Sequence, residues 1–332
     1  MRKFILLTAS ALLLGACSSD PLKVDASNVK VSISYTNYDS LLFAVPDEQA
    51  APTLEKVDPE AVEYLFGYCL GMGKESDSGF YQRLNRFKTE AYILALHKSI
   101  SKKFANLPDR HQKIVDGFRH LKKHISDVSL PQHLIYANSY FTSSAFSTEH
   151  SLVIGLERYL GEKNPQIGQL PPDQFYQWIK EGMDDRYLER DVVASWIMTH
   201  VMPEMESDAT VVDEMIYWGK VLYLTEAAFP DAEKSVILRY QQKDFDWATT
   251  NEKQFWDYLV KEKLLFSKDE KAKANFTHEG PFTPGLPEEG PDRLGQFIGW
   301  RIVHSYVEQY DVTLPQLLKL SANELLQEYQ ID

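Results

Sequence analysis

A cysteine that directly follows a short apolar leader is the feature that most constrains this chain. Two basic residues open the leader, and an apolar run over residues 4–14 follows them. This run is too short to remain in a bilayer as a spanning helix. Small residues then lead into Cys17. The pattern predicts a secretory signal peptide at residues 1–16 that is removed from the mature chain.

The residues that end the leader resemble the lipobox of bacterial lipoproteins, with the sequence Leu14-Gly15-Ala16-Cys17. The resemblance implies that Cys17 becomes the acylated, palmitate-bearing first residue and anchors the chain to a membrane. Each buried methylene contributes about 0.8 kcal/mol, so a multiply acylated cysteine is a stable anchor. An ordinary signal peptide cut after Ala16 is the alternative. Residues 17–28 are expected to form a short polar tether.

The second cysteine, Cys69, lies among apolar neighbours and is interpreted as a buried structural thiol. No disulfide framework can then support the fold, so a hydrophobic core must do so. With 44% hydrophobic and 25% charged residues, the chain suits a single globular domain over residues 29–332. A net charge of −13 argues against binding to nucleic acid or electrostatic adhesion to anionic lipid.

Helical periodicity dominates the sequence, and strand-like segments are few. Alternation over residues 29–35 predicts a half-buried strand, and apolar runs over 133–141 and 151–156 predict two more, joined by a Ser/Thr-rich connection. Helices are expected over 38–43, over 58–124 with breaks near 71–73 and 108–109, over 184–203, 209–229, 252–263 and 292–310, and from Ser321 onward, with 46–57 a loop. The predicted fold is a mostly helical α+β domain with a small antiparallel or mixed sheet.

The helix expected over 184–203 is where a zinc peptidase would carry its HExxH motif. The chain has no such motif, and the window that ends at His200 keeps one histidine without the glutamate base. His200 is therefore interpreted as a hydrogen-bonded histidine. A metal-dependent hydrolase is the alternative, with a site made of His200, Glu214 and one of Asp185 and Glu189.

Two features of the C-terminal helices indicate helix packing. Lys220 has apolar residues at its i±3 and i±4 positions, so its amine must reach solvent or meet a partner. We interpret Lys220 as a paired lysine that fixes two helices. Gly295 and Gly299 lie four residues apart on the core side of the helix over 292–310, where they allow another helix to approach closely.

The segment over 280–291 is rich in proline and glycine and predicts a stiff loop that presents a surface. In the following helix Arg293, Arg301 and His304 fall on one face. This face is either solvated or the wall of a groove under the loop. Together with Lys220 and Trp300, these residues are our binding-surface candidates; we expect no metal and no cofactor.

A set of motifs in the mature chain is similar to the gliding-motility lipoprotein GldB family of Bacteroidota. The motifs are Glu214-Met215-Ile216-x-x-Gly219-Lys220-x-Leu222-Tyr223, Trp256 before Leu264-Leu265-Phe266, Gly280-Pro281-Phe282-Thr283, Gly290-Pro291-x-Arg293-x-Gly295-x-x-Ile298-Gly299-Trp300-x-Ile302-Val303-x-Ser305-Tyr306, and Leu156-x-x-Tyr159-Leu160-Gly161.

The resemblance implies an envelope lipoprotein that supports gliding and, in gliding species, the type IX secretion machinery. It also implies a distant similarity to predicted zinc metallopeptidases, and so a degenerate zincin-like scaffold without its catalytic motif. We therefore expect a non-catalytic protein that contacts other envelope motility or secretion proteins. Ser18, rather than an aspartate, after the lipid site is compatible with sorting to the outer membrane. The residues after Cys17 lack the acidic run associated with surface export, so the domain is expected to face the periplasm.

Overall fold

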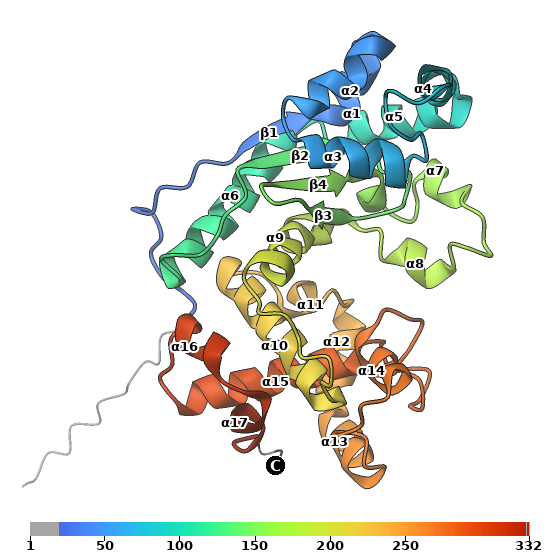
Figure 1. Ribbon diagram of the computed structural model, residues 1–332. Coiled ribbons are helices and arrows are strands. Elements are labelled where there is room, and N and C mark those ends of the chain that lie inside the picture. The colour runs from blue at the N-terminus through green and yellow to red at the C-terminus, as the bar shows by residue number, and fades with distance from the viewer. Residues whose placement is uncertain (1–19, 330, 332) are drawn as a thin grey trace, which may run out of the picture.

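The computed structural model describes residues 20–329 and 331. Helices make up most of the fold and surround a single four-stranded sheet, as Figure 1 shows. The predicted mostly helical α+β class is confirmed. The predicted leader and Cys17 lie outside the described residues.

The sheet is mixed, with the strand order β1-β2-β4-β3. Strands β1 (Ser34–Asn37), β2 (His133–Ala137) and β4 (Ser151–Gly155) are parallel, and β3 (Ala145–Ser147) runs antiparallel to β4. The two predicted apolar strands are thus confirmed as β2 and β4. The connection between them contains an unpredicted edge strand, β3, and β1 starts later than the predicted strand over 29–35.

Side chains of both sheet faces are buried, as expected for a parallel sheet covered on two sides. Leu134 and Tyr136 belong to one core cluster, whereas Ile135 and Ala137 belong to a second cluster on the opposite face. The first cluster includes residues of α5 (Ala91–Lys103), α6 (Leu107–His124) and α9 (Leu188–His200). The second includes residues of α1 (Tyr38–Ala44), α2 (Asp47–Glu55), α3 (Pro59–Val62), the π-helix η1 (Glu63–Cys69) and α4 (Phe80–Thr89).

The prediction of a loop over residues 46–57 is wrong, because α2 occupies most of this range. Asp47 and Glu48 fall in the first helical turn, where their charges match the helix dipole, and Leu54 is buried. The predicted start of the next helix is confirmed, because Asp58 accepts hydrogen bonds from two backbone amides of α3. The helix break predicted near 108–109 is confirmed at residues 104–106, between α5 and α6, and Pro108 lies in the first turn of α6.

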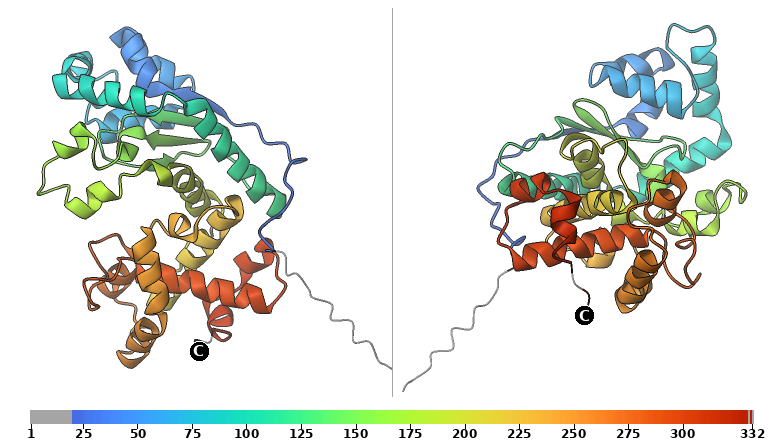
Figure 2. Two further views of the ribbon diagram at one scale, coloured as in Figure 1. Left: turned by 180° about the vertical axis from the view of Figure 1, so that it is seen from behind. Right: turned by 60° about the horizontal axis from the view of Figure 1, so that its bottom comes forward.

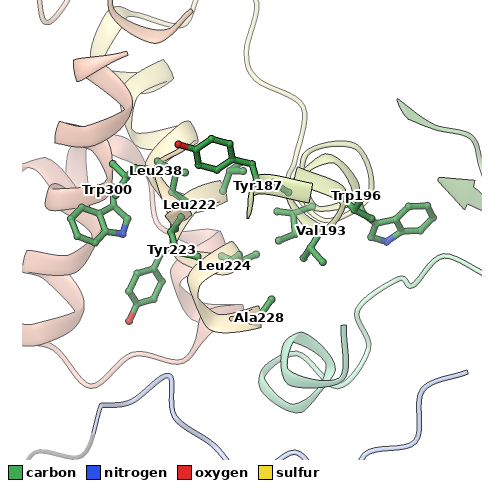
Figure 3. Packing of buried hydrophobic residues seen from close by; sticks show 14 of the residues in the cluster. Tyr187, Val193, Trp196, Leu222, Tyr223, Leu224, Ala228, Leu238 and Trp300 are labelled. Atoms are coloured by element: carbon green, nitrogen blue, oxygen red, sulfur yellow. The ribbon is translucent and has the colours of Figure 1, made fainter. Parts of the chain in front are cut away.

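The C-terminal half is built around α10 (Val211–Ala228) and α15 (Leu294–Gln309), which form the most extensive helix–helix contact of the described residues. Gly299 lies against the backbone of α10, and a Cβ atom there would be 1.7 Å from the carbonyl oxygen of Met215. This confirms the packing role predicted for the glycines. Figure 3 shows the hydrophobic side chains that join α9, α10 and α15, among them Val193, Leu222 and Trp300.

Short helices complete the fold, and Figure 2 shows from two sides that those after residue 230 gather away from the sheet. They are η2 (Leu156–Tyr159), α7 (Pro165–Gly168), α8 (Gln177–Glu181), η3 (Asp185–Tyr187), α11 (Lys234–Ile237), α12 (Gln242–Thr250), α13 (Glu252–Lys261), α14 (Glu270–Thr277), α16 (Leu314–Lys319) and α17 (Ala322–Leu326). The predicted capping box that opens the last helix is confirmed, because Ser321 and Glu324 exchange side-chain and backbone hydrogen bonds.

The N-terminal segment that the structure describes lies against the domain. Leu22 and Ala26 are buried, and Lys23 forms an ion pair of 2.7 Å with Asp231. Cys69 is a free, buried thiol, as predicted, and burial raises its pKa to about 12. Within residues 20–329 and 331, no helix combines the length and the apolar character that a membrane crossing needs.

Candidate binding cleft

A cavity of about 300 Å³ lies where the two halves of the chain meet at the proline-rich loop. Helix α8 forms one wall, and the segment between α11 and α12 forms another; Figure 1 shows α8 above these helices. The third wall is the segment over 279–293. Three arginines line the cavity, Arg158, Arg239 and Arg293, and we call it the arginine cleft.

The loop wall of the cleft is fixed by hydrogen bonds that close its two ends on each other. The Asp292 carboxylate accepts from the Gly280 amide at 2.9 Å. The Thr283 hydroxyl donates to the Pro291 carbonyl at 2.8 Å and accepts from the Leu294 amide at 3.2 Å. The loop is therefore held in one shape where it meets α15, as the stiff loop predicted from the sequence requires.

Arg239 is held in the floor of the cleft by a full set of acceptors. Its guanidinium donates to Asp191 at 3.1 Å, to Glu279 at 2.7 Å and to the Gly182 carbonyl at 3.0 Å. It also lies 5.2 Å from the centre of the Tyr187 ring. These contacts join the sheet-side half of the chain, through Gly182 and Asp191, to the C-terminal half.

Arg293 lies beside Arg239 and has a looser set of partners. Its Nε is 3.0 Å from Asp292, and it donates through Nη2 to the Arg239 carbonyl at 3.2 Å. Its Nη1 is 3.9 Å from Glu279, beyond hydrogen-bond distance. The guanidinium also lies 5.5 Å from the centre of the Tyr240 ring. Arg293 therefore keeps donor capacity on the side of Glu279.

Arg158 differs from the other two arginines because it has no carboxylate partner among the described residues. Its donors reach the Phe141 carbonyl at 3.2 Å and the Ser144 hydroxyl at 3.4 Å. Both acceptors are neutral. The positive charge of Arg158 is thus left without a counter-ion of its own within residues 20–329 and 331.

The buried ions of the cleft hold each other in their charged forms. Burial acts to raise the pKa of Asp191, but Arg239 and Arg190 outweigh it and leave that pKa below its ordinary value. Glu279 behaves in the same way beside Arg239 and Arg293. The neighbouring guanidinium groups therefore hold Asp191 and Glu279 in their charged forms at neutral pH.

The mouth of the cleft is acidic. Glu288 and Glu289 are exposed on the loop, and Glu181 and Asp244 lie opposite them. Burial raises the pKa of Asp244, and the negative charges of Asp292 and Glu181 add to the shift, against the opposing effect of Lys243. The cleft thus has two charge layers, with arginines in its floor and carboxylates around its mouth.

The comparison with protein-family models supplies the relationship of the chain. The model described as gliding motility protein GldB matches residues 19–330. The chain belongs to this family. Neither the curated proteins nor the solved structures include a match. The match confirms the resemblance drawn from the motifs, and it covers all three walls of the arginine cleft.

The structure separates the predicted binding-surface residues of this GldB-family chain. Arg293 lines the arginine cleft, and Arg301 is half exposed on α15, where it pairs with Glu252 at 2.9 Å. Trp300 and His304 turn inward, and each hydrogen-bonds to the buried carboxylate of Glu226 at 2.8 Å. Lys220 is buried as well. One face of α15 therefore divides between a cleft wall and a buried polar cluster.

The partner of Lys220 is backbone rather than a carboxylate. Its amine donates to the carbonyl of Leu320, just after α16, at 2.5 Å and contacts that of Leu318, in the last turn of α16, at 3.4 Å. The lysine thus joins α10 to the C-terminal helices, which is the packing role expected of it. Burial lowers its pKa from 10.5 to about 8, while Glu324 opposes the shift.

We expect Lys220 to make stability rise with pH in the alkaline range. Between about 8 and 10.5 the unfolded chain binds the proton that the folded chain has lost, so the free energy of unfolding increases. The expected gain over this range, relative to Lys220→Met, is about 2–3 kcal/mol. Urea unfolding of both chains at several pH values measures it. Parallel pH profiles would contradict the assignment.

The residues of the alternative hydrolase site have separate partners. The His200 ring stacks on Trp196, with centroids 3.6 Å apart, whereas Glu214 accepts from the Thr277 hydroxyl at 2.5 Å. Asp185 and Glu189 are both paired with Arg110. Among the described residues, no group of three or more histidine, cysteine, aspartate or glutamate side chains is placed to share a metal ion. The geometry therefore gives this alternative no support.

Sequence reasoning missed two of the three cleft arginines. Arg158 occupies an unspecified position inside the family motif Leu156-x-x-Tyr159-Leu160-Gly161, and Arg239 follows a four-residue helix with no motif around it. Helical spacing identified Arg293, but no local pattern in the sequence indicated which distant segments would meet it.

Proposed function

We propose that this GldB-family protein is a lipid-anchored, non-catalytic lipoprotein that supports gliding motility or type IX secretion through contacts with other envelope proteins. The match of the family model to residues 19–330 carries the proposal. In this account Cys17 is the acylated residue, and one domain over residues 29–332 faces the periplasm from the outer membrane.

The arginine cleft supports a binding role for the domain. Its ionic side chains are fixed by hydrogen bonds and stay charged at neutral pH, so they form a rigid surface for a polar partner. A rigid loop wall and a charged floor are typical of a recognition site rather than of a packing interface.

Deletion of the gene tests the proposal. We expect the deletion strain to lose colony spreading or to secrete fewer proteins by the type IX route, and the intact gene to restore the loss. Colony diameter and the secreted proteome are measured together. Normal spreading together with a normal secreted proteome would contradict the proposed function.

Replacement of Cys17 by alanine tests the anchor. We expect Cys17→Ala to move the protein from the membrane fraction to the soluble periplasmic fraction and to abolish complementation of the deletion strain. The domain should keep its thermal unfolding temperature, because the packed part of the chain that the structure describes begins near Leu22. A soluble Cys17→Ala chain that restores spreading in full would rule out the need for the anchor.

A further inference from the structure

One arginine of the arginine cleft has no carboxylate partner among the described residues. Arg239 and Arg293 lie beside the carboxylates of Asp191, Glu279 and Asp292, whereas Arg158 forms an ion pair with none of them. The unpaired charge is that of Arg158 within the described residues. A guanidinium group in a recessed site gains free energy when it meets an anion. The floor therefore fits one additional negative group.

Two of the three cleft arginines have a left-handed backbone conformation. Within the described residues, positive φ occurs at five residues other than glycine, and Arg239 and Arg293, with φ of 59° and 51°, are two of them. Phe141, which accepts a hydrogen bond from Arg158, is a third with φ of 65°. Such conformations cost about 1–3 kcal/mol each and gather at ligand-binding sites.

Glu279 shows how an anion is held in the cleft. Its side chain is 48% exposed, yet its carboxylate lies 2.7 Å from Arg239 and 3.9 Å from Arg293. It stands at the start of the loop and can turn out to solvent, because about half of its side chain is already exposed. A partner carboxylate that enters the cleft would take the position that the Glu279 carboxylate now occupies. There it would meet the free donors of Arg293 and Arg158.

The mouth of the cleft selects the part of the partner that follows this anion. Glu288 and Glu289 are exposed there, opposite Glu181 and Asp244. Lys243 is the one lysine among the described residues that line the cleft. An acidic partner segment would be repelled at the mouth, whereas lysine or arginine side chains would be attracted. The cavity of about 300 Å³ has room for the end of a chain but not for a folded surface.

We propose that the arginine cleft binds the carboxyl terminus of a partner peptide that carries basic side chains close to its terminal carboxylate. The carboxylate contacts Arg158 and Arg293 and displaces Glu279, and the basic side chains lie among the acids of the mouth. This inference rests on the proposed function, whose partner it describes.

Fluorescence anisotropy of the full chain in detergent tests the inference with defined peptides. The probe is a dye-labelled hexapeptide of alanines with lysines at the second and third positions from a free carboxyl terminus. The same peptide with a terminal amide, and a version with glutamates in place of the lysines, are the controls. Both controls are expected to bind about tenfold or more weakly, because each loses contacts between charged groups.

Two cleft variants give opposite expected results. Arg158→Gln weakens binding of the probe by about tenfold, since it removes the arginine without a counter-ion. Glu279→Gln tightens binding by about threefold or more, because it removes the carboxylate charge that competes with the ligand for the arginines. Arg119→Gln is the matched control: it removes an arginine from the surface of α6, paired with Asp116, and leaves binding unchanged.

Preference for the free carboxyl terminus together with tighter binding by Glu279→Gln supports the inference. Equal binding of acid and amide, weaker binding by Glu279→Gln, or no binding of the probe overturns it. If Arg158→Gln does not fold, the Glu279→Gln result decides. If the peptide does not bind but the deletion strain has lost spreading, the inference about the cleft is overturned and the proposed function stands. If the peptide binds but the deletion strain has no phenotype, the proposed function alone is overturned.

Discussion

Replacement of Gly299 by alanine is expected to destabilise the protein by about 3 kcal/mol, because a methyl group there cannot fit between α15 and α10. The new Cβ atom would lie 1.7 Å from the Met215 carbonyl oxygen and 2.4 Å from its carbon. Backbone atoms cannot move aside as a flexible side chain can, so the two helices must separate. The free energy of unfolding, measured with urea, gives the effect.

Gly67→Ala is the control for this prediction. Gly67 is also helical, within η1, but a Cβ atom there would have no neighbour within 4 Å. Its replacement is expected to be neutral or to stabilise by about 0.4–1 kcal/mol, because alanine restricts the unfolded chain. Equal losses of stability at the two positions would show that the α10–α15 contact does not require residue 299 to lack a side chain.

Replacement of Glu157 by alanine has the second large expected effect, a loss of about 4 kcal/mol. Glu157 is fully buried, and one of its carboxylate oxygens accepts three hydrogen bonds. The donors are the Ser139 amide at 3.0 Å, the Ser139 hydroxyl at 2.5 Å and the Phe141 amide at 2.8 Å. Alanine would leave the Ser139 and Phe141 amides buried and unpaired, whereas the Ser139 hydroxyl keeps the Ser143 carbonyl as an acceptor. Urea unfolding of Glu157→Ala measures the cost.

Glu157→Gln separates hydrogen bonding from charge. Glutamine keeps an acceptor oxygen, so this variant is expected to fold. Burial raises the pKa of Glu157 above 4.5, although Ser139 and Phe141 oppose the shift. The folded state therefore binds the proton more tightly, and the stability it contributes at low pH is lost as pH rises through the folded pKa. Relative to Glu157→Gln, wild-type stability should fall above about pH 4.5; a constant difference would contradict this.

Much of the fold follows from local patterns in the sequence. Apolar runs identified β2 and β4, because strands buried on both faces carry few polar residues. The capping residues Asp58 and Ser321 marked helix starts, since their side chains satisfy free backbone amides. The glycines of α15 indicated a close helix contact, and the closest approach is indeed at Gly299.

Other parts of the fold depend on long-range contacts that no local pattern records. Strand β3 has three half-buried residues and forms only by pairing with β4. Strand β1 pairs with residues about 100 positions away, so its register is set by β2 rather than by its own alternation. Helix α2 forms where a loop was expected because its small residues are buried against the second core cluster.

The candidate site was predictable only in part. The proline-rich loop and Arg293 were identified from composition and helical spacing, but the cleft also needs Arg158 and Arg239 from distant segments. The positive φ angles of Arg239 and Arg293 have no sequence signature, since arginine is not a residue that favours this conformation. Trp300 was expected at a surface and is instead buried against Glu226, and Lys220 joins helices as expected but through backbone carbonyls.

The central claim is that this tethered domain acts through its arginine cleft, and complementation with an Arg158→Glu chain tests it most directly. Arg158 has only two long hydrogen bonds to neutral groups, so charge reversal there should leave the fold intact. We predict that the variant reaches the membrane at the wild-type level but fails to restore spreading or secretion to the deletion strain. Full restoration by the Arg158→Glu chain would contradict the account.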